Sequence, residues 1–465
     1  MLRKKLVLLF LSLIFIFSQS GINPENGYAS VNPMLEQGSQ YMQGDYDPTA
    51  EQPTPYNWNR ISSFNGIEKN PYKKWTYKPN QNPAEYSFKS SPVIDSDGTI
   101  YVVQNSFNNG SLLALNKDGS LKWKFDTFQQ ASFQSPVISN DGTILFATTN
   151  GLYAVDKNKN MKWFYAIGTP ATPAISNDGK VYFTRRGKEL TALDLKTGTV
   201  IWRTPIDDYC DGTPAIGSDG TIYLAITGGE YSASFINAYN SDGSVKWKYR
   251  APSGLGNHIG YGSPTISNDG STIYVGNKDK NLYAINTSDG TLKWKFATGR
   301  DGRENPVVDK NGTIYFGSDK FYALNPDGTV KWTFTISNYG IMGTPIMDAS
   351  GNIYFKTYDN IYCLDNNGNL KWKLNPAEDM STQSSMAMGS DGTLYMSGYY
   401  SSVIAIGGEQ EFTICEKANY LDTLIESGLD TQEKVDNAKA ELEILQQKVQ
   451  EYQTTINEAE LNLTK

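Results

Sequence analysis

A unit of four short strands recurs along this chain, and a recurring unit constrains a fold more strongly than any other sequence feature. Its clearest copy runs from Ser263 to Phe296 and reads SPTISNDGSTIYVGNKDKNLYAINTSDGTLKWKF. Four short runs, apolar or alternating, are separated by Asn-Asp-Gly, by an Asn-Lys-Asp-Lys loop and by Ser-Asp-Gly. Asp-Gly between alternating runs is a strong hairpin signal, because glycine adopts a positive φ without steric cost. The unit is therefore expected to form a four-stranded antiparallel meander.

The turn glycine of the first hairpin marks the copies of this unit. It falls at Gly98, Gly142, Gly179, Gly220, Gly270, Gly312, Gly351 and Gly392. Aspartate precedes this glycine in most copies, and Asn311 and Ser350 are the two exceptions. Six residues before the glycine stands a proline, which Met386 replaces in the last copy. Proline is tolerated at the first residue of a strand, because no hydrogen-bond donor of the ladder is lost there.

A tryptophan lies in the last strand of each unit except the eighth. These residues are Trp123, Trp163, Trp202, Trp247, Trp294, Trp332 and Trp372. The eighth unit instead ends at Val403–Gly407, and the missing tryptophan stands near the other end of the chain, at Trp75. The segment Lys74–Lys78 is therefore expected to complete the last sheet. This pattern predicts a ring that is closed by joining the two chain ends.

Successive tryptophans, counted from Trp75, are 38 to 48 residues apart. A period of roughly 40 to 50 residues with four strands per unit is typical of a β-propeller blade. A β-solenoid would not need its two ends to complement each other, whereas a propeller leaves only short, protected edges. The fold class expected is all-β: an eight-bladed β-propeller of four-stranded antiparallel blades over residues 71–408, with seven blades as the alternative.

The N-terminal segment has the features of a secretory signal peptide. Arg3, Lys4 and Lys5 precede the apolar run Leu6–Phe17, which is too short to span a bilayer that needs about 20 residues. Residues 1–20 are therefore expected to be removed, with cleavage after Ser20 or near Ala29. No cysteine follows the run, which argues against a lipoprotein anchor. Residues 21–70 are polar, show no period and are interpreted as a leader.

Charge and cysteine usage exclude some classes of function. The net charge is −8, so the basic patch that nucleic-acid binding needs is not indicated, and neither is an electrostatic membrane anchor. The cysteines are Cys210, Cys363 and Cys415, whose number and spacing fit neither a disulfide framework nor a CxxC metal site. Cys363 stands where other units carry alanine, and is expected to be a small buried core residue.

The pattern changes to helical after Glu409. Ile414, Ala418, Leu421 and Ile425 have helical spacing, and Asp430 with Glu433 forms a capping box. From Val435 to Leu463 apolar residues alternate three and four apart, which predicts a coiled coil. Residues 409–465 are thus expected to form a helical coiled-coil tail that makes homo-oligomers through 431–465. An antiparallel hairpin in which residues 413–427 cover the first half of the seam remains the alternative.

The units resemble a known family. ALDLKTGTVIW (Ala192–Trp202) has the form A-x-D-x-x-T-G-x-x-x-W, which resembles the tryptophan-docking motif of quinoprotein, or PQQ-like, propellers. The resemblance covers roughly residues 75–407. It implies eight blades, with each tryptophan packed flat against the neighbouring blade. Relatives of this kind include PQQ-dependent dehydrogenases and non-enzymatic propellers, so the fold does not carry a reaction with it.

The resemblance also implies which residues a dehydrogenase of this family would contain. Such dehydrogenases use a vicinal Cys-Cys ring, a Ca²⁺ site of Glu, Asn and Asp, an Asp base and large loops over the channel. This chain has no adjacent cysteines and only short loops. No catalytic, cofactor or metal residues are therefore assigned, and PQQ with Ca²⁺ is the cofactor only under the alternative of a quinoprotein dehydrogenase. The Asp-Gly turns, which resemble the start of a Ca²⁺ loop, lack its later ligands and are interpreted as turn geometry.

The connections from each tryptophan strand to the next unit differ between copies, whereas the strands repeat. In a propeller these connections surround one mouth of the channel, and variation on a rigid scaffold is typical of a binding surface. The single histidine lies there, without the serine, cysteine or paired carboxylate of a catalytic set. The candidate binding residues at this mouth are Asp208, Tyr209, Asp211, His258, Arg300, Arg303, Glu304, Tyr339 and Glu378.

The sequence thus leads to one functional hypothesis and one rival. The leading hypothesis is a secreted or cell-envelope propeller without catalysis, which binds a protein or glycan and uses its tail for attachment or oligomerisation. No transmembrane segment is expected after signal cleavage. The rival is a PQQ-dependent dehydrogenase.

Overall fold

The computed structural model describes the region that was expected to form the propeller, with gaps. The described residues are 61–79, 86–88, 90–106, 110–127, 134–168, 171–185, 189–207, 210, 212–226, 235–250, 263–277, 279–300, 305–336, 340–377, 380, 384–398 and 402–409. All of them belong to one unit of the chain, which spans residues 34–410. The signal peptide and the coiled-coil tail lie outside the described residues, and both stay predictions.

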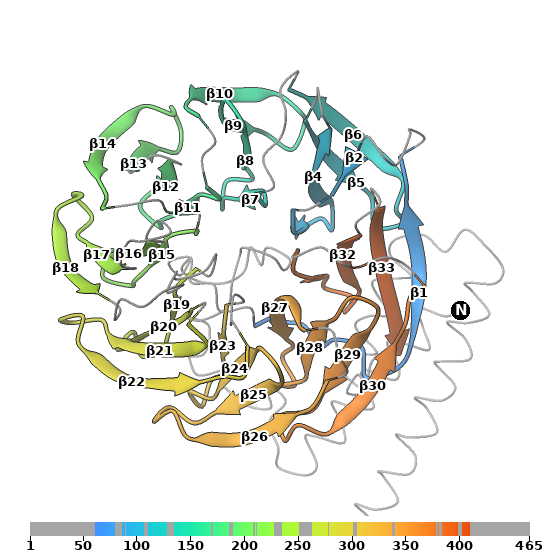
Figure 1. Cartoon of the computed structure of the whole chain (residues 1–465). Helices are drawn as coiled ribbons and strands as arrows, with labels where there is room; N and C mark the ends of the chain where they lie inside the picture. The colour runs from blue at the N-terminus through green and yellow to red at the C-terminus, as the bar shows by residue number, and fades with distance from the viewer. Residues whose placement is uncertain are drawn as a thin grey trace, which may run out of the picture. The chain divides into compact units, whose positions relative to one another are not determined.

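The described residues form eight antiparallel sheets, which Figure 1 shows as blades around an axis. Each inner strand is short and each outer strand lies at the rim, and we number the blades along the chain. Blades 1 to 4 contain β3 (Val93–Ile94), β4 (Ile100–Ser106), β5 (Ser111–Leu115), β6 (Leu121–Asp126), β7 (Val137–Ile138), β8 (Ile144–Thr148), β9 (Gly151–Val155), β10 (Met161–Ala166), β11 (Ala174–Ile175), β12 (Lys180–Arg185), β13 (Glu189–Asp194), β14 (Val200–Pro205), β15 (Ala215–Ile216), β16 (Ile222–Ile226), β17 (Phe235–Tyr239) and β18 (Val245–Arg250).

Blades 5 to 8 continue the same pattern. They contain β19 (Thr265–Ile266), β20 (Thr272–Gly276), β21 (Asn281–Asn286), β22 (Leu292–Ala297), β23 (Val307–Val308), β24 (Ile314–Gly317), β25 (Phe321–Leu324), β26 (Val330–Phe334), β27 (Met342–Met347), β28 (Ile353–Lys356), β29 (Ile361–Leu364), β30 (Leu370–Leu374), β31 (Ala387–Met388), β32 (Leu394–Gly398), β33 (Ser402–Glu409) and β1 (Lys69–Tyr77). A short extra strand, β2 (Tyr86–Ser87), pairs with the end of β4. No helix occurs among the described residues, and therefore none there is long and apolar enough to cross a membrane.

The ring is closed by strands from the two ends of the propeller, as the sequence predicts. Strand β1 pairs antiparallel with β33, and Trp75 lies opposite Ala405. Blade 8 therefore takes three strands from the C-terminal part and its outer strand from the N-terminal part. The observed strand starts at Lys69, a few residues before the expected one, because its pairing continues past a bulge to Glu409.

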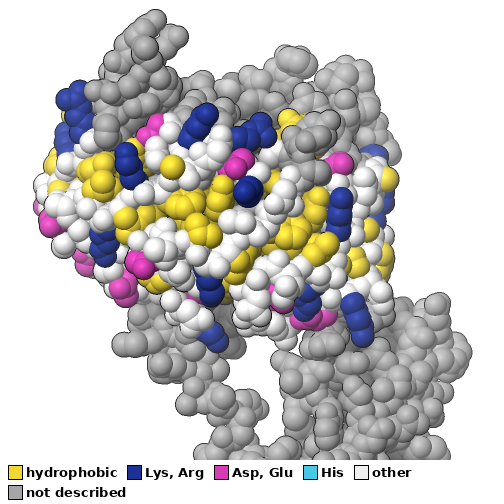
Figure 2. All heavy atoms as spheres, turned by 60° about the horizontal axis from the view of Figure 1, so that its bottom comes forward, with side chains coloured by type: hydrophobic (Ala, Val, Ile, Leu, Met, Phe, Trp, Pro, Cys, Tyr) yellow, Lys and Arg dark blue, Asp and Glu magenta, His cyan; other side chains and the backbone are white. Residues whose placement is uncertain are grey.

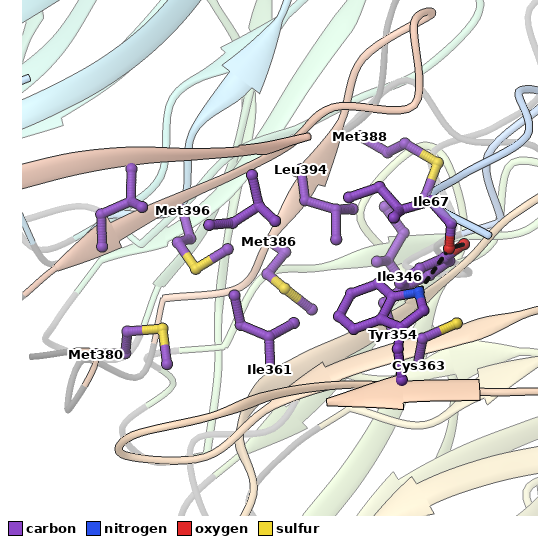
Figure 3. Packing of buried hydrophobic residues seen from close by; sticks show 13 residues of the cluster. Ile67, Ile346, Tyr354, Ile361, Cys363, Met380, Met386, Met388, Leu394 and Met396 are labelled. Carbon is purple, nitrogen blue, oxygen red and sulfur yellow. Dashed lines mark hydrogen bonds between the residues drawn. The ribbon is translucent and has the colours of Figure 1, made fainter. Parts of the chain in front are cut away.

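The core is a ring of eight apolar clusters rather than one central mass. Each cluster combines residues of two neighbouring blades, and together they join every blade to the next. Figure 3 shows the cluster between blades 7 and 8, which contains Met380, Met386, Met388 and Met396 together with Cys363. Cys363 is fully buried, as expected. Methionine adapts its shape to irregular gaps, which suits the interface that the chain ends complete.

Each tryptophan ties its blade to the next one. The indole N–H donates to a carbonyl oxygen in the turn between the third and fourth strands of the following blade, at 2.8–3.0 Å in seven cases. In six of these cases the ring also lies against the glycine of that turn, as Trp294 does against Gly328. The expected docking of each tryptophan on the neighbouring blade is thus confirmed for these seven. Trp372 docks on residues near Ile67 instead.

A lysine–aspartate–threonine contact recurs inside the blades. The lysine before the tryptophan reaches the Asp-Gly-Thr turn of its own blade, as Lys246 does at 3.0 Å from Asp219 and 2.8 Å from Thr221. In blade 8 the lysine is Lys74 of β1, which bonds to Asp391 and Thr393. The same contact therefore also fastens the N-terminal strand.

The pKa values of the aspartates in these turns predict how the stability of the fold depends on pH. Partial burial acts to raise the pKa of Asp97 and Asp219, but hydrogen bonds from the neighbouring threonine and the charge of the lysine outweigh it, and the pKa is lowered. The pKa of Asp141 is lowered in the same way. A lowered folded-state pKa stabilises the fold above the unfolded value of about 3.9, and this stabilisation is lost as pH falls below it. We expect the free energy of unfolding to fall between about pH 5 and pH 2.

Denaturant titrations at a series of pH values measure this effect. In the triple variant Asp97→Asn, Asp141→Asn, Asp219→Asn, the amide side chains can still accept the hydrogen bonds of the turns but cannot ionise. Its free energy of unfolding is therefore expected to change less steeply below about pH 4. A slope equal to that of the wild-type protein would show that these carboxylates do not control the acid transition.

Candidate functional site

The blades present two different faces. Two hairpin turns of a blade lie on the same face: the turn between the first and second strands, as at Gly98, and the turn between the third and fourth strands, as at Gly119. Most of these turns contain a glycine with positive φ, and we call this face the turn face. The opposite face carries the hairpins between second and third strands and the connections between blades, and we call it the connection face. Inner turns of the turn face are nearly constant in length, whereas the connections differ from blade to blade. A site that is specific to this protein is therefore expected on the connection face.

A belt of hydrogen bonds surrounds the axis where the connections enter the inner strands. In six of the blades, the side chain of the residue before the repeated proline, or before Met386 in blade 8, accepts a hydrogen bond from the backbone N–H of the equivalent residue in the preceding blade. Ser91 N–H donates to Ser135 Oγ at 2.9 Å, and Ser385 N–H donates to Ser91 Oγ at 2.8 Å, which joins the last blade to the first. The other links run from Ser135 to Thr172, Thr213 to Ser263, Ser263 to Asn305 and Thr344 to Ser385.

The belt has two breaks among the described residues. No such bond joins Thr172 to Thr213 or Asn305 to Thr344, and Thr172 N–H donates instead to Gln134 Oε1 at 3.2 Å. The breaks lie between blades 3 and 4 and between blades 6 and 7. The belt explains why Ser-Pro and Thr-Pro recur: the hydroxyl bonds to the neighbouring blade, while proline starts the strand. This repeated pair is thus structural.

Most of the predicted binding residues lie outside the described residues. These are Asp208, Tyr209, Asp211, His258, Arg303, Glu304, Tyr339 and Glu378. Arg300 is described, and it lies exposed on the connection between blades 5 and 6. Its backbone oxygen accepts hydrogen bonds from Thr298 Oγ1 at 2.6 Å and from Ser318 Oγ at 2.8 Å. The backbone of Arg300 is therefore held by both blades, and the residue is exposed.

A polar cluster between blades 3 and 4 was not singled out from the sequence. Asp207 accepts hydrogen bonds from Lys248 Nζ and Asn237 Nδ2, both at 2.8 Å, and Asn237 is fully buried. Burial acts to raise the pKa of Asp207, but the bonds from Lys248 and Asn237 outweigh it and lower the pKa. A signal existed: the position of Asn237 in the third strand is occupied by tyrosine in several other blades, as at Tyr283.

Several buried amide groups near the connection face have no hydrogen-bond partner among the residues that the structure describes. They are Gln104 Nε2, Asn105 Oδ1, Asn237 Oδ1 and both side-chain polar atoms of Asn277. Buried polar atoms are normally satisfied by protein or by ordered water. Gln104 and Asn277 occupy equivalent positions at the ends of β4 and β20, in opposite blades of the ring. These amides can bind water or the polar groups of a ligand.

The described cysteines and acidic residues do not form a shared centre. No three His, Cys, Asp or Glu side chains within the described ranges are placed to hold one metal ion. Cys210 lies in the interface between blades 3 and 4, and Cys363 in the interface between blades 7 and 8. Burial raises the pKa of the Cys363 thiol, which keeps it protonated. The two cysteines are thus separate core residues.

The rim carries exposed apolar side chains, which the repeat places two residues before the tryptophan in the outer strands of blades 1 to 7. Figure 2 shows hydrophobic side chains gathered in a band across the surface, with lysine and arginine beside them. On the outer strands of blades 5 to 7 the exposed residues are Leu292, Val330 and Leu370. Isolated exposed apolar residues are normal on protein surfaces. Their regular spacing follows from the repeat and does not by itself mark a site.

Comparison with known proteins places this geometry among PQQ-like propellers. A family model described as outer membrane protein assembly factor BamB matches residues 166–313 and 269–410, which is more than half of the chain. Protein Rv3035 of Mycobacterium tuberculosis is 24% identical over 266 residues, covering 51% of this chain and 64% of that protein. The chain spans less than two thirds of the length of the curated relatives that it matches first.

Two solved structures share the fold at low sequence identity. The crystal structure of BamB from Moraxella catarrhalis superposes with a TM-score of 0.58 at 15% identity, covering 73% of this chain and 100% of that one. A europium-containing methanol dehydrogenase superposes with a TM-score of 0.63 at 12% identity, covering 80% and 99%. One of these structures is an assembly factor and the other an enzyme, so the likeness shows the fold alone.

Proposed function

Because the chain belongs to the family of PQQ-like repeat β-propellers, we propose that it is a non-catalytic binding protein of the cell envelope that holds a protein partner on its connection face. It is exported by the N-terminal signal peptide, and the coiled-coil tail makes it oligomeric or attaches it. The name of its BamB relatives, outer membrane protein assembly factor, supports a role in binding at the envelope. A glycan partner is the alternative within this class.

The proposal rests on the different roles of residues that repeat in the blades and residues that do not. The residues that recur from unit to unit stabilise the ring. Tryptophans dock on the next blade, the axial belt joins the inner strands, and turn aspartates form hydrogen bonds within their own blades. Several departures from the repeat lie on or near the connection face, at Asp207, Asn237, Asn277 and Arg300. Side chains that the fold does not require are the ones that a partner can select.

A quinoprotein dehydrogenase remains the rival, because one structural relative is a methanol dehydrogenase. The cysteines argue against it: none are adjacent in the sequence, and the two described ones are buried in separate interfaces. Adding PQQ and Ca²⁺ to the purified protein tests this rival. A stable quinone spectrum with dye-linked oxidation of alcohols or sugars would replace our proposal.

Site-directed photocrosslinking in the host tests the proposed face. A photoreactive amino acid at Arg300, exposed on the connection face, is expected to capture one defined envelope protein. The matched control is the same group at Asp118, which is exposed on the turn face. Capture at both positions, or at neither, would contradict a partner site on the connection face.

The tail makes a separate prediction about mass. We expect light scattering to show a multiple of the 51.6 kDa chain mass, less the signal peptide, for full-length protein, and a single-chain mass after truncation at Gln410. The truncation keeps β33, which ends at Glu409, so blade 8 stays complete. Equal numbers of chains in both proteins would show that the heptad pattern does not drive oligomerisation.

A further inference from the structure

Residues 61–68, which we call the strap, pack on blade 7. They take the position that the turn between the third and fourth strands of the next blade takes elsewhere in the ring. In the other blades the indole N–H reaches the turn between the third and fourth strands of the next blade. Blade 8 has no such turn, because its third and fourth strands come from different ends of the propeller. Trp372 Nε1 instead donates to Ile67 O at 2.7 Å, across 305 residues of sequence. The strap therefore occupies a docking position that ring closure leaves open.

The strap contacts blade 7 as a bound extended peptide does. Ser62 N–H donates to Met347 O at 2.7 Å, and Ala349 N–H donates to Phe64 O at 3.0 Å. Its only β-pairing is one isolated parallel bridge between Ile61 and Met347, so it is not a strand of any blade. Backbone bonds to a peptide give affinity, and side-chain contacts give specificity.

Three successive residues of the strap carry that specificity. A Cβ atom on Gly66 would lie 2.3 Å from the Tyr354 hydroxyl oxygen, so only glycine fits. Ile67 is 1% exposed and packs in the cluster of Trp372 and Met388, as Figure 3 shows. Glu68 forms an ion pair with Lys371 and accepts a hydrogen bond from Asn352 Nδ2 at 2.9 Å. These contacts thus fit glycine, a large aliphatic residue and an acid, in that order.

Blade 7 itself departs from the repeat where it meets the strap. Its inner turn carries Ser350 where most units have aspartate, and Ser350 Oγ donates to Asn65 Oδ1 at 2.6 Å. Asn352 takes the place of the usual threonine and bonds to Glu68 and to Asp348. Asp348 Oδ2 also accepts from Gly66 N–H at 3.1 Å. Both sides of the contact therefore differ from the repeat in a matched way.

We propose that this part of the turn face is a peptide-binding groove, which the chain fills with its own strap and which accepts the same Gly-Ile-Glu sequence supplied in trans. A bulge at Asn70, with φ 49°, interrupts the pairing of β1 beside Lys69, so the strap can leave while residues 72–77 stay paired in blade 8. Segments held by few backbone bonds open more readily than paired strands. This inference concerns the turn face and is independent of the function proposed for the connection face.

Binding of a labelled peptide with the sequence of residues 59–69 tests the groove in the full chain. The tethered strap competes at high effective concentration, so the wild-type protein is expected to bind the peptide weakly. The variant Glu68→Lys places a lysine beside Lys371, which expels the strap and leaves the groove unchanged. It is expected to bind the wild-type peptide about ten-fold or more tightly than the wild-type protein does. A peptide with valine in place of glycine at the Gly66 position is expected not to bind.

Two further measurements keep the test decisive. Adding Trp372→Phe to Glu68→Lys removes the donor to the Ile67 carbonyl but keeps an aromatic ring, and is expected to weaken peptide binding. In the wild-type protein, hydrogen exchange of strap amides is expected to be faster than that of β33. Peptide affinity that is unchanged by Glu68→Lys, equal binding of the valine peptide, or strap exchange as slow as that of β33 would each overturn the proposal.

Discussion

Trp75→Ala is expected to destabilise the propeller as much as Trp294→Ala, by roughly 3–5 kcal/mol each, although Trp75 lies outside the continuous run of repeats. The contacts of the two side chains are equivalent. Trp75 Nε1 donates to Lys117 O at 2.8 Å and Trp294 Nε1 to Pro326 O at 2.9 Å, and each ring lies against a turn glycine of the next blade. Removing either ring leaves a cavity between two blades and an unpaired carbonyl group.

Chemical denaturation of both variants measures this equality. The matched control is Tyr72→Ala on the same strand, whose side chain is 54% exposed and whose loss should change stability by less than about 0.5 kcal/mol. If Trp75→Ala behaved like Tyr72→Ala while Trp294→Ala was strongly destabilised, β1 would not be part of a blade in solution.

Gly328→Ala is expected to destabilise the propeller by about 2 kcal/mol or more. Gly328 has a φ of 85°, where an L side chain is strained, and its added Cβ would lie 2.7 Å from the Trp294 ring. The strain and the overlap act together, because the indole is held by its bond to Pro326 O and cannot move away without losing it.

Blade 2 allows the opposite substitution, from a side chain to glycine, at the equivalent turn position. Lys159 occupies the equivalent turn position with a φ of 71°, and it is the one turn of this kind among the described blades where a side chain replaces glycine. Lys159→Gly is expected to stabilise the protein by about 0.5–1 kcal/mol, since the relief of strain exceeds the entropy that glycine loses on folding. Urea midpoints of both variants measure the pair. Destabilisation by Lys159→Gly would show that the lysine side chain makes contacts that compensate for its strained backbone.

Most of the fold could be predicted from the sequence, because the signals are local and occur in every unit. Asp-Gly turns, first-residue prolines and strand tryptophans recur in the same order in most units, and Trp75 identifies the partner of the incomplete unit. The chemical site could not be predicted in the same way. Asp207, Asn237 and Lys248 are brought together by neighbouring blades, and no local pattern marks that contact.

The sequence by itself predicted eight blades, with seven as the alternative, and their strand order, since both depend on hydrogen bonding and side-chain alternation within about 40 to 50 residues. It also predicted where the ring closes, because the last unit lacks the tryptophan that Trp75 supplies. Only the tertiary structure decided what the Ser-Pro and Thr-Pro pairs do and where Trp372 docks. Ser385 meets Ser91 across 294 residues, and Trp372 meets Ile67 across 305. Such contacts arise only after the ring has brought the chain ends together, so they leave no periodic signal along the chain.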